Sequence, residues 1–373
     1  MKTQLLDNGL YVVDNNEVAA FSPQNGEAES HVIEIPEGII KIGRNAFAGT
    51  ENIQKIILPD SLEAIGEDAF SMSNIEEVEF GKGLIKIEQK AFSNCLSIKS
   101  MTLPENLMSI GNGVFRDCKN LENIILNDAL KFIGSAAFYG CKGLKKIELP
   151  ASVNAIGNEA FFDVAEVTIK GEHIPHNFTG AVTMHYDEFA KKYLESSGRL
   201  SIKVNFKGES IFLPKYIDEN LVSMCECALS SDIDEMTQNL YGFGLGGEVI
   251  YDTAYWQYKS IVYSGKEPCE KLKKYVKRMS KNIFLTLFEH GLEEEQLCFI
   301  KLGLLTPNAL NKLYEIVKDK NPVVAACLLD EINIEENSKV KAAVEYLQEV
   351  ITRMGVNDVT FSAVQKGEAT IIR

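Results

Sequence analysis

The sequence predicts an α+β chain of two domains, in which a solenoid with a parallel β-sheet face is followed by an all-α helical-repeat domain. Two observations predict this fold class. A phenylalanine recurs at nearly constant spacing in the first half, and helical periodicity replaces this pattern in the second half. Such spacing is typical of stacked units, because one unit cannot bury its own apolar face. The recurring residues, at intervals of 23, 22, 23, 23 and 23, are Phe47, Phe70, Phe92, Phe115, Phe138 and Phe161.

Each repeat contains two extended segments. The first alternates apolar and polar residues, as in Ile147-Glu-Leu149, and in four repeats it is followed by a proline, which cannot continue a β-ladder. The second ends in Ile-Gly, and this glycine predicts a corner with φ > 0 or a close approach of two backbones. Glu88 replaces the glycine in one repeat. The Ala-Phe pair that follows is expected to bury its ring between neighbouring coils.

The change of period sets the expected domain limits. We predict an N-terminal β-hairpin cap at residues 1–32, the repeats at 33–170, an exit cap at 171–207 and a helical domain at 208–373. The exit cap is expected to hold a short helix at 186–198 and a strand at 200–206. The expected helices of the last domain cover residues 217–229, 232–240, 251–262, 269–279, 283–290, 293–302, 308–318, 322–329 and 338–354.

The repeat pattern Leu-x-x-Ile-x-Leu-Pro…Ile-Gly-x-x-Ala-Phe-x-x-Cys resembles the BspA-type leucine-rich repeat family of bacterial proteins, over residues 10–206. The resemblance implies a right-handed leucine-rich repeat solenoid with a parallel sheet on one face and irregular segments on the other. Farther along, residues 280–333 look like degenerate ankyrin-type helix pairs, although the usual Thr-Pro-Leu-His signature is absent.

The charge and the N-terminal residues bound the setting in which the protein works. A net charge of −15 argues against binding nucleic acid or an anionic membrane through bulk electrostatics. The sequence contains no run of 18 apolar residues, so we expect no transmembrane helix. The first residues lack the apolar core of a signal peptide, which predicts a cytoplasmic protein. A secreted or cell-surface location is the alternative, through an export route not visible in the sequence.

Several clusters of reactive residues favour a structural interpretation. Three of the eight cysteines occupy one repeat position and predict a ladder of buried thiols. His173 and His176 lie close in sequence, but Pro175 between them prevents a regular helix from presenting both rings on one face. The glycine-rich stretch 242–247 lacks the Lys-Ser/Thr of a phosphate loop, and the basic cluster at 271–281 is best explained as a solvated helix face. We therefore predict no metal, no cofactor and no enzymatic activity.

The predicted binding surface is the outward side of the Ile-x-Leu strands. The sequence favours a non-enzymatic scaffold that binds an unknown protein partner through this face, through the helical domain, or through both. Two alternatives remain open: a secreted or surface adhesin of the BspA type, and a regulator or enzyme with its activity in the helical domain. The oligomeric state is not predicted. The outward residues form one row of Glu34, Ile57, Glu79, Thr102, Ile125 and Glu148, and a second row of Lys55, Glu77, Ser100, Asn123 and Lys146.

Overall fold

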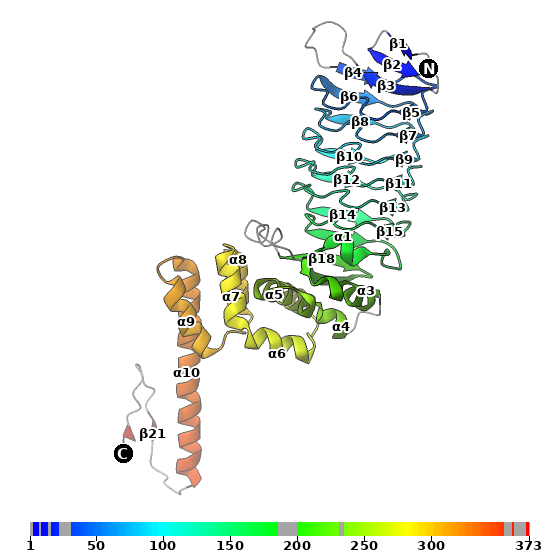
Figure 1. Cartoon of the computed structure of the whole chain (residues 1–373). Coiled ribbons are helices and arrows are strands. Elements are labelled where there is room, and N and C mark those ends of the chain that lie inside the picture. Colours follow the sequence, from blue (N-terminus) through cyan, green and yellow to red (C-terminus); the bar gives the residue numbers. More distant parts are fainter. Residues whose placement is uncertain are drawn as a thin grey trace. The chain divides into compact units, whose positions relative to one another are not determined.

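A computed structural model describes residues 3–6, 9–13, 16–21, 31–185, 200–230, 235–353, 360–361 and 371–372. The chain divides into two compact units, Met1–Leu272 and Lys273–Arg373. The first holds a β-solenoid and the second is helical (Figure 1), so the predicted fold class is confirmed. The helix expected at residues 186–198 lies outside the described residues.

Strands from successive coils stack in parallel on two faces of the solenoid (Figure 1). One face, here called the Ile-x-Leu sheet, carries the longer strand of each repeat. Its strands are β4 (His31–Glu34), β6 (Ile53–Ile57), β8 (Glu77–Glu79), β10 (Ser100–Thr102), β12 (Asn123–Ile125), β14 (Lys146–Leu149) and β16 (Glu166–Ile169).

The opposite face, here called the Ile-Gly sheet, differs from the irregular segments that the family resemblance implied. It consists of two-residue strands that pair in parallel through their backbones. The extended Lys-Ile and Ala-Ile pairs of successive coils are close enough to form a ladder, so regular structure extends to this side. The strands are β5 (Lys41–Ile42), β7 (Ala64–Ile65), β9 (Lys86–Ile87), β11 (Ser109–Ile110), β13 (Phe132–Ile133) and β15 (Ala155–Ile156).

An N-terminal meander covers the first coil. Its strands β1 (Thr3–Leu5), β2 (Leu10–Val13) and β3 (Glu17–Phe21) are antiparallel to one another. Strand β3 then pairs in parallel with β5, which makes the Ile-Gly sheet nine-stranded. The apolar edge of the first coil is therefore covered, as a repeat stack requires.

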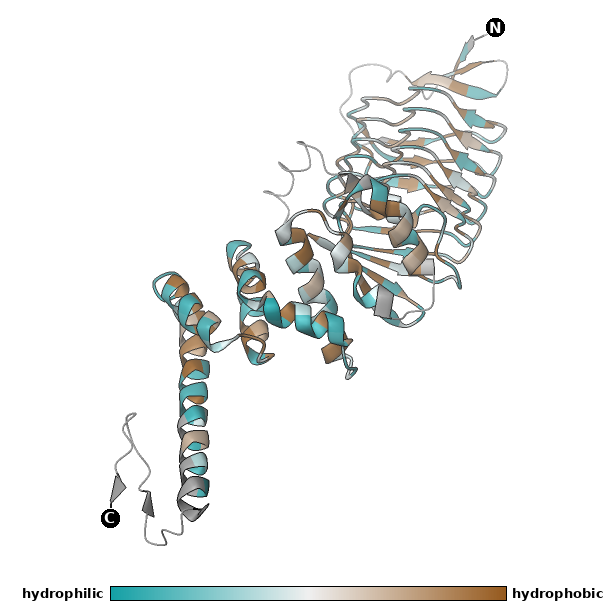
Figure 2. Cartoon of the chain, turned by 60° about the horizontal axis from the view of Figure 1, so that its bottom comes forward, coloured by the Kyte–Doolittle hydropathy of each residue, from teal (hydrophilic) through white to brown (hydrophobic). Residues whose placement is uncertain are grey.

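The recurring phenylalanines form a continuous stack in the core. Neighbouring rings from Phe47 to Phe161 lie 5.0 to 5.7 Å apart between centroids and are nearly parallel. Phe21 of the N-terminal meander continues the stack, with its centroid 5.4 Å from that of Phe47. Sequence reasoning missed Phe21, because it lies outside the repeat pattern. Along the coils apolar and polar segments alternate (Figure 2), as expected for strands that bury one side.

The repeated glycine is required by close approach of coils, not by a positive φ. A Cβ atom built on Gly43, Gly66, Gly111, Gly134 or Gly157 would lie 2.2 to 2.8 Å from backbone atoms of the neighbouring coil. A positive φ, between 52° and 60°, occurs instead two residues before each phenylalanine of the stack. Of the two explanations that the sequence left open for this glycine, the close approach is the one that holds. The positive-φ residues are Asn45, Asp68, Lys90, Gly113, Ala136 and Glu159.

Regular β structure continues beyond the limit expected at residue 207. After α1 (Phe178–Val182) and β17 (Met184–His185), strand β18 (Ser201–Phe206) pairs in parallel with β16. Strand β19 (Glu209–Pro214) returns antiparallel to β18, and the expected limit falls in the turn between them. A helix was expected to begin at residue 217. Instead β20 (Tyr216–Ile217) and the 3-10 turn η1 (Glu219–Leu221) precede α3 (Val222–Ser230).

Helix α5 (Gly247–Tyr263) packs on the β18–β19 hairpin. The Gln257 side chain accepts a hydrogen bond from the Phe212 amide at 2.8 Å, and the buried Asp252 carboxylate accepts one from the Ser201 hydroxyl at 2.6 Å. These bonds satisfy polar groups that would be costly to bury without a partner. The shorter elements α4 (Glu235–Gln238) and η2 (Leu240–Phe243) precede α5, and α6 (Glu270–Arg278) follows it.

The second unit contains α7 (Ser280–Glu289), α8 (Glu293–Lys301), α9 (Pro307–Val317) and α10 (Pro322–Arg353). Helix α9 begins as its sequence indicates, because the Thr306 side chain accepts from the Ala309 amide and Pro307 occupies the first turn. Helix α10 is a single element where two were expected. Residues 330–337 contain neither proline nor glycine, so nothing in the sequence ends the helix there. Strands β21 (Thr360–Phe361) and β22 (Ile371–Ile372) follow.

Candidate functional site

The two predicted rows lie on the outer side of the Ile-x-Leu sheet. All their residues are exposed except Ile57 and Lys55, which are half-buried. The alternating residues, such as Ile56 and Ile147, are buried in the core. Parallel pairing places Lys55 beside Glu77, Ile57 beside Glu79, Ser100 beside Asn123 and Thr102 beside Ile125. The structure thus brings the predicted residues together on one face, and their role in binding stays a prediction.

Ion pairs occupy the N-terminal end of this face. The Lys55 ammonium contacts the Glu79 carboxylate and lies 3.0 Å from a carboxylate oxygen of Glu77. Hydrogen bonds to Glu79 and then to Glu77 raise the pKa of Lys55 above its ordinary value. These charged groups therefore already have partners within the chain.

A second set of ion pairs occupies the C-terminal end. Lys170 lies 2.6 Å from Glu148, and the pKa of Lys170 is raised mainly by its hydrogen bond to this carboxylate. Glu166 contacts Lys146 at 3.5 Å and Lys203 at 3.3 Å. Burial alone would raise the pKa of Glu166. The hydrogen bond from Asn205 and the charge of Lys203 outweigh it, so the pKa is lowered.

The centre of the face carries no charge. It consists of Ser100, Thr102, Asn123 and Ile125 on the paired strands β10 and β12, here called the β10–β12 face. Ile125 is 53% exposed although it is a large apolar residue. A neutral, hydrogen-bonding and partly apolar surface between two charged ends is easier to desolvate than its surroundings.

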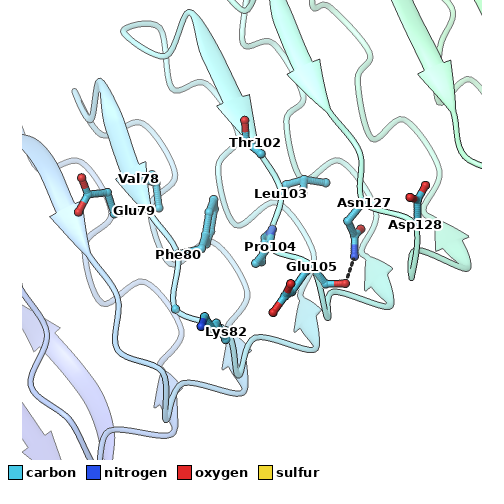
Figure 3. Close-up of a pocket in the computed structure, with 11 residues that line it drawn as sticks. Val78, Glu79, Phe80, Lys82, Thr102, Leu103, Pro104, Glu105, Asn127 and Asp128 are labelled. Atoms are coloured by element: carbon cyan, nitrogen blue, oxygen red, sulfur yellow. Dashed lines mark hydrogen bonds between the residues drawn. The ribbon is translucent and has the colours of Figure 1, made fainter.

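An open groove of about 820 Å³ adjoins the β10–β12 face, where β8, β10 and β12 end (Figure 3). It lies where the Ile-x-Leu sheet is interrupted. Leu58 N donates to Glu79 O at 2.8 Å and Leu103 N donates to Ile125 O at 2.9 Å, which joins their coils. Within the described residues, the equivalent amide of Phe80 makes no hydrogen bond to β10. The groove is lined by Val78, Glu79, Phe80, Gly81, Lys82, Thr102, Leu103, Pro104, Glu105, Asn127 and Asp128.

Two glycines bring this coil close to the coil before it. A Cβ atom on Gly81 would lie 2.1 Å from the carbonyl oxygen of Pro59, and one on Gly83 would lie 2.1 Å from that of Asp60. The absence of side chains allows this close approach, and we infer that it draws the coil away from the coil after it. On the far side Asn127 donates to the carbonyls of Glu105 and Leu107, at 2.8 and 2.9 Å.

Sequence reasoning placed the binding surface on this sheet but did not single out the groove. Two signals were present. The interval from Phe70 to Phe92 is 22 residues where the others are 23, and Gly81 stands where both adjacent repeats have proline. Both mark the coil that carries Phe80. The signal is therefore a departure from the repeat and not the repeat itself.

A second groove, of about 520 Å³, crosses the Ile-Gly sheet beside Phe132. Its floor follows the column of glycines that the stacking of coils requires, including Gly111, Gly134 and Gly157. The shape of this groove is therefore accounted for by the fold.

The predicted ladder of cysteines is a structural element. The thiols of Cys95, Cys118 and Cys141 are buried and donate to phenylalanine carbonyls of the preceding coil at 3.0 to 3.1 Å. Burial raises the pKa of Cys95 to about 11 and that of Cys141 to about 12. These thiols therefore stay protonated at neutral pH and are poor nucleophiles.

The remaining sequence clusters lie in helices and connecting segments. Across the described ranges, no group of three or more His, Cys, Asp and Glu side chains could hold a metal ion. The glycine-rich stretch 242–247 leads from η2 into α5, and Lys271, Lys274 and Lys277 are exposed on α6 while Leu272 and Val276 are buried. None of the described helices has both the length and the apolar character needed to cross a membrane.

Comparison with known proteins finds a family model that matches part of the repeat region. Residues 25–129 match the model of the BspA type leucine rich repeat region, in six copies. This confirms the resemblance that the repeat pattern predicted, while Phe138 and Phe161 lie beyond the matched residues. The resemblance of residues 280–333 to ankyrin repeats stays a prediction. No protein with a curated description matches the chain.

Solved structures of bacterial leucine-rich repeat proteins are similar to part of the chain. A T. pallidum leucine rich repeat protein has 22% identity and a TM-score of 0.39, over 52% of this chain and 92% of that one. The pneumococcal vaccine antigen PcpA has 22% identity and a TM-score of 0.39, over 47% of this chain and 49% of its own. This chain thus spans about half the length of that antigen. A leucine rich cell surface protein of Faecalibacterium prausnitzii has 20% identity and a TM-score of 0.36, over 58% of this chain and 61% of that one.

Proposed function

We propose that this chain, whose solenoid contains BspA-type leucine-rich repeats, is a non-enzymatic scaffold that binds a protein partner through the Ile-x-Leu sheet. The observation that carries the proposal is the distribution of charge on this sheet. Ion pairs occupy both ends, and the β10–β12 face between them is neutral and exposes Ile125. Binding there would not require breaking the ion pairs.

The rigidity of the surface supports the same proposal. The strands are held from below by the buried phenylalanine stack and from the side by parallel backbone pairing. A surface that is already ordered loses little conformational entropy when a partner binds. The short side chains of Ser100, Thr102 and Asn123 add few rotatable bonds, so their ordering costs less than that of lysine or glutamate.

The compartment belongs to the proposal. We favour the cytoplasm, because the chain carries eight free cysteines, among them the exposed Cys227. Cell fractionation of the source organism tests this point. Native protein in the culture medium or on the outer surface would instead favour the adhesin alternative.

Site-specific photocrosslinking tests the binding surface. A benzophenone amino acid replaces Asn123 in the β10–β12 face, and irradiation of the living source cells is followed by mass spectrometry of the adducts. We expect one discrete protein adduct that purified partner and purified chain reproduce in vitro. The matched control carries the same amino acid at Lys131, which is exposed next to the Ile-Gly sheet.

The variant Ile125→Glu supplies the second comparison. It places a charge on the neutral face without touching the core, because Ile125 is 53% exposed. We expect the Asn123 adduct to be lost while the melting temperature is unchanged. The proposal is refuted if the probe at Asn123 yields only adducts that the probe at Lys131 also yields. It is equally refuted if Ile125→Glu leaves the Asn123 adduct intact.

A further inference from the structure

We propose that the groove between β8 and β10 receives an extended peptide segment of the partner, which inserts an apolar side chain between the coils and places a lysine or arginine on the acidic rim. This inference rests on the proposed function and specifies the chemistry of its partner. It goes beyond the outward rows, since the residues that carry it belong to the core side and to the strand ends.

The floor of the groove contains two apolar residues whose equivalents in the preceding coil are buried. Val78 and Phe80 occupy the inward positions of β8 and its continuation, and both are half-buried. The equivalent residues of the preceding coil, Ile56 and Leu58, are 0% and 3% exposed. The ring of Phe80 lies between the chains of β8 and β10 (Figure 3) and meets the Phe92 ring edge-on, 6.5 Å between centroids.

The partial exposure of Val78 and Phe80 determines which chemical groups the groove can bind. Covering half-buried apolar side chains with a further apolar group is favourable, because it removes their remaining surface from water. The gap lies between two coils whose backbones are not hydrogen-bonded to each other at Phe80, although the Asn106 side chain donates to the Lys82 carbonyl at 2.9 Å. An aliphatic or aromatic side chain on an extended backbone fits such a slot, and Phe80 offers an edge or a face for aromatic packing.

The rim of the groove selects a positive charge. Glu79, Glu105 and Asp128 line it together with a single cation, Lys82. Glu79 is already paired with Lys55, but no ion pair within 4 Å involves Glu105 or Asp128 in the part of the chain that the structure describes. Asp128 acts on Lys170 only as a minor contribution to the raised pKa of that lysine. A cation entering the groove would therefore meet exposed carboxylates, those of Glu105 and of Asp128, that form no ion pair in the described part of the chain.

Selection from a random library of linear peptides displayed on phage tests the inference, with the intact chain as the immobilised target. We expect the enriched sequences to share an aromatic or aliphatic residue next to a lysine or arginine. The most enriched peptide is then synthesised with a fluorescent label, and its affinity is measured by anisotropy at low and high salt. Screening of the rim charges should weaken binding as salt rises.

Three variants assign the binding to the groove. The pair Glu105→Gln with Asp128→Asn removes both carboxylates at nearly constant shape, and we expect affinity to fall roughly three- to tenfold. Glu51→Gln with Glu63→Gln removes the same charge from exposed sites outside the groove and should leave affinity unchanged. Phe80→Leu replaces the ring by leucine, the residue found at the equivalent positions Leu58 and Leu103 of neighbouring coils. This variant should also weaken binding while the chain stays folded.

The outcomes separate this inference from the proposed function. The inference is overturned if no peptide is selected, if the selected peptides lack a basic residue, or if the rim pair and the control pair bind alike. If Asn123 still gives its specific adduct in that case, the scaffold function stands without the groove. If neither the crosslink at Asn123 nor the peptide selection yields a partner, the scaffold function and the groove inference are both refuted.

Discussion

The phenylalanine stack makes a quantitative prediction about stability. Phe92 lies in the middle of the stack, is fully buried, and has its centroid 5.0 Å from that of Phe70 and 5.7 Å from that of Phe115. Removing a buried phenylalanine side chain costs about 3–5 kcal/mol, and each aromatic pair adds about 0.5–1.5 kcal/mol beyond burial. We expect Phe92→Ala to lose at least about 4 kcal/mol, a large share of the stability of a typical domain.

The matched control is Phe132→Ala, which makes the same chemical change on the surface. Phe132 belongs to β13 but is 52% exposed, so the loss should stay within about 1 kcal/mol. Urea unfolding followed by circular dichroism and by the fluorescence of Trp256 measures both. Trp256 is the only tryptophan and stacks on Phe212 at the end of the solenoid, 6.1 Å between centroids. Equal losses for the two variants would refute the conclusion that a ring in the buried stack stabilises the fold more than an exposed ring.

Three further predictions concern Cys118, Gly157 and Glu166. Because burial raises the pKa of Cys118 well above its ordinary value, iodoacetamide at pH 8 should modify the exposed Cys227 and leave Cys118 unmodified until the chain unfolds, as peptide mass mapping would show. Gly157→Ala should cost about 1–3 kcal/mol in urea unfolding, because its Cβ would lie 2.2 Å from a backbone nitrogen, whereas Gly242→Ala, with open space around it, should be neutral or stabilising. The lowered pKa of Glu166 stabilises the fold above the pKa that this group has in the unfolded chain. This contribution is lost as pH falls through the lower folded-state pKa, so Glu166→Gln should flatten the acid limb of the melting temperature against pH.

The sequence predicts those features of the fold that recur in every repeat. The inward Ile and Phe positions, the cysteine ladder and the outward rows all follow from a fixed spacing, because identical positions in stacked coils meet the same environment. Phe21 was missed because a single residue outside the repeat has no spacing to reveal it, although it continues the same stack. The extension of the sheet through β19 was missed because an antiparallel return strand breaks the parallel pattern of the repeats.

The groove was missed for a different physical reason. It lies between coils, and the packing that we infer to shape it, that of Gly81 against Pro59, does not depend on the local preference of either residue. No single repeat contains this information, since both neighbours must be known before the gap can be located. Glu105 and Asp128 likewise come to line one groove only when two successive coils are brought together.

The packing of Gly81 leads to a prediction about the groove itself. A methyl group at this position would clash with the Pro59 carbonyl oxygen at 2.1 Å, so Gly81→Ala should push its coil away from the preceding coil and toward β10. The gap should then narrow, and the Phe80 amide should come within reach of the Thr102 carbonyl, the bond that Leu58 and Leu103 make in neighbouring coils. Hydrogen exchange at the Phe80 amide is the direct measurement, and we expect it to slow while the affinity for the selected peptide falls.

The matched control for this variant is Gly113→Ala, at a glycine of the next coil whose Cβ would meet only side-chain atoms at 3.5 Å or more. It has a positive φ of 60°, so it strains its own turn without moving the coil against its neighbour. A slower Phe80 amide in Gly81→Ala but not in Gly113→Ala would tie the opening of the groove to this one glycine. If exchange at Phe80 is unchanged and the chain remains folded, the separation of the coils has another cause, and the explanation of the groove by Gly81 is wrong.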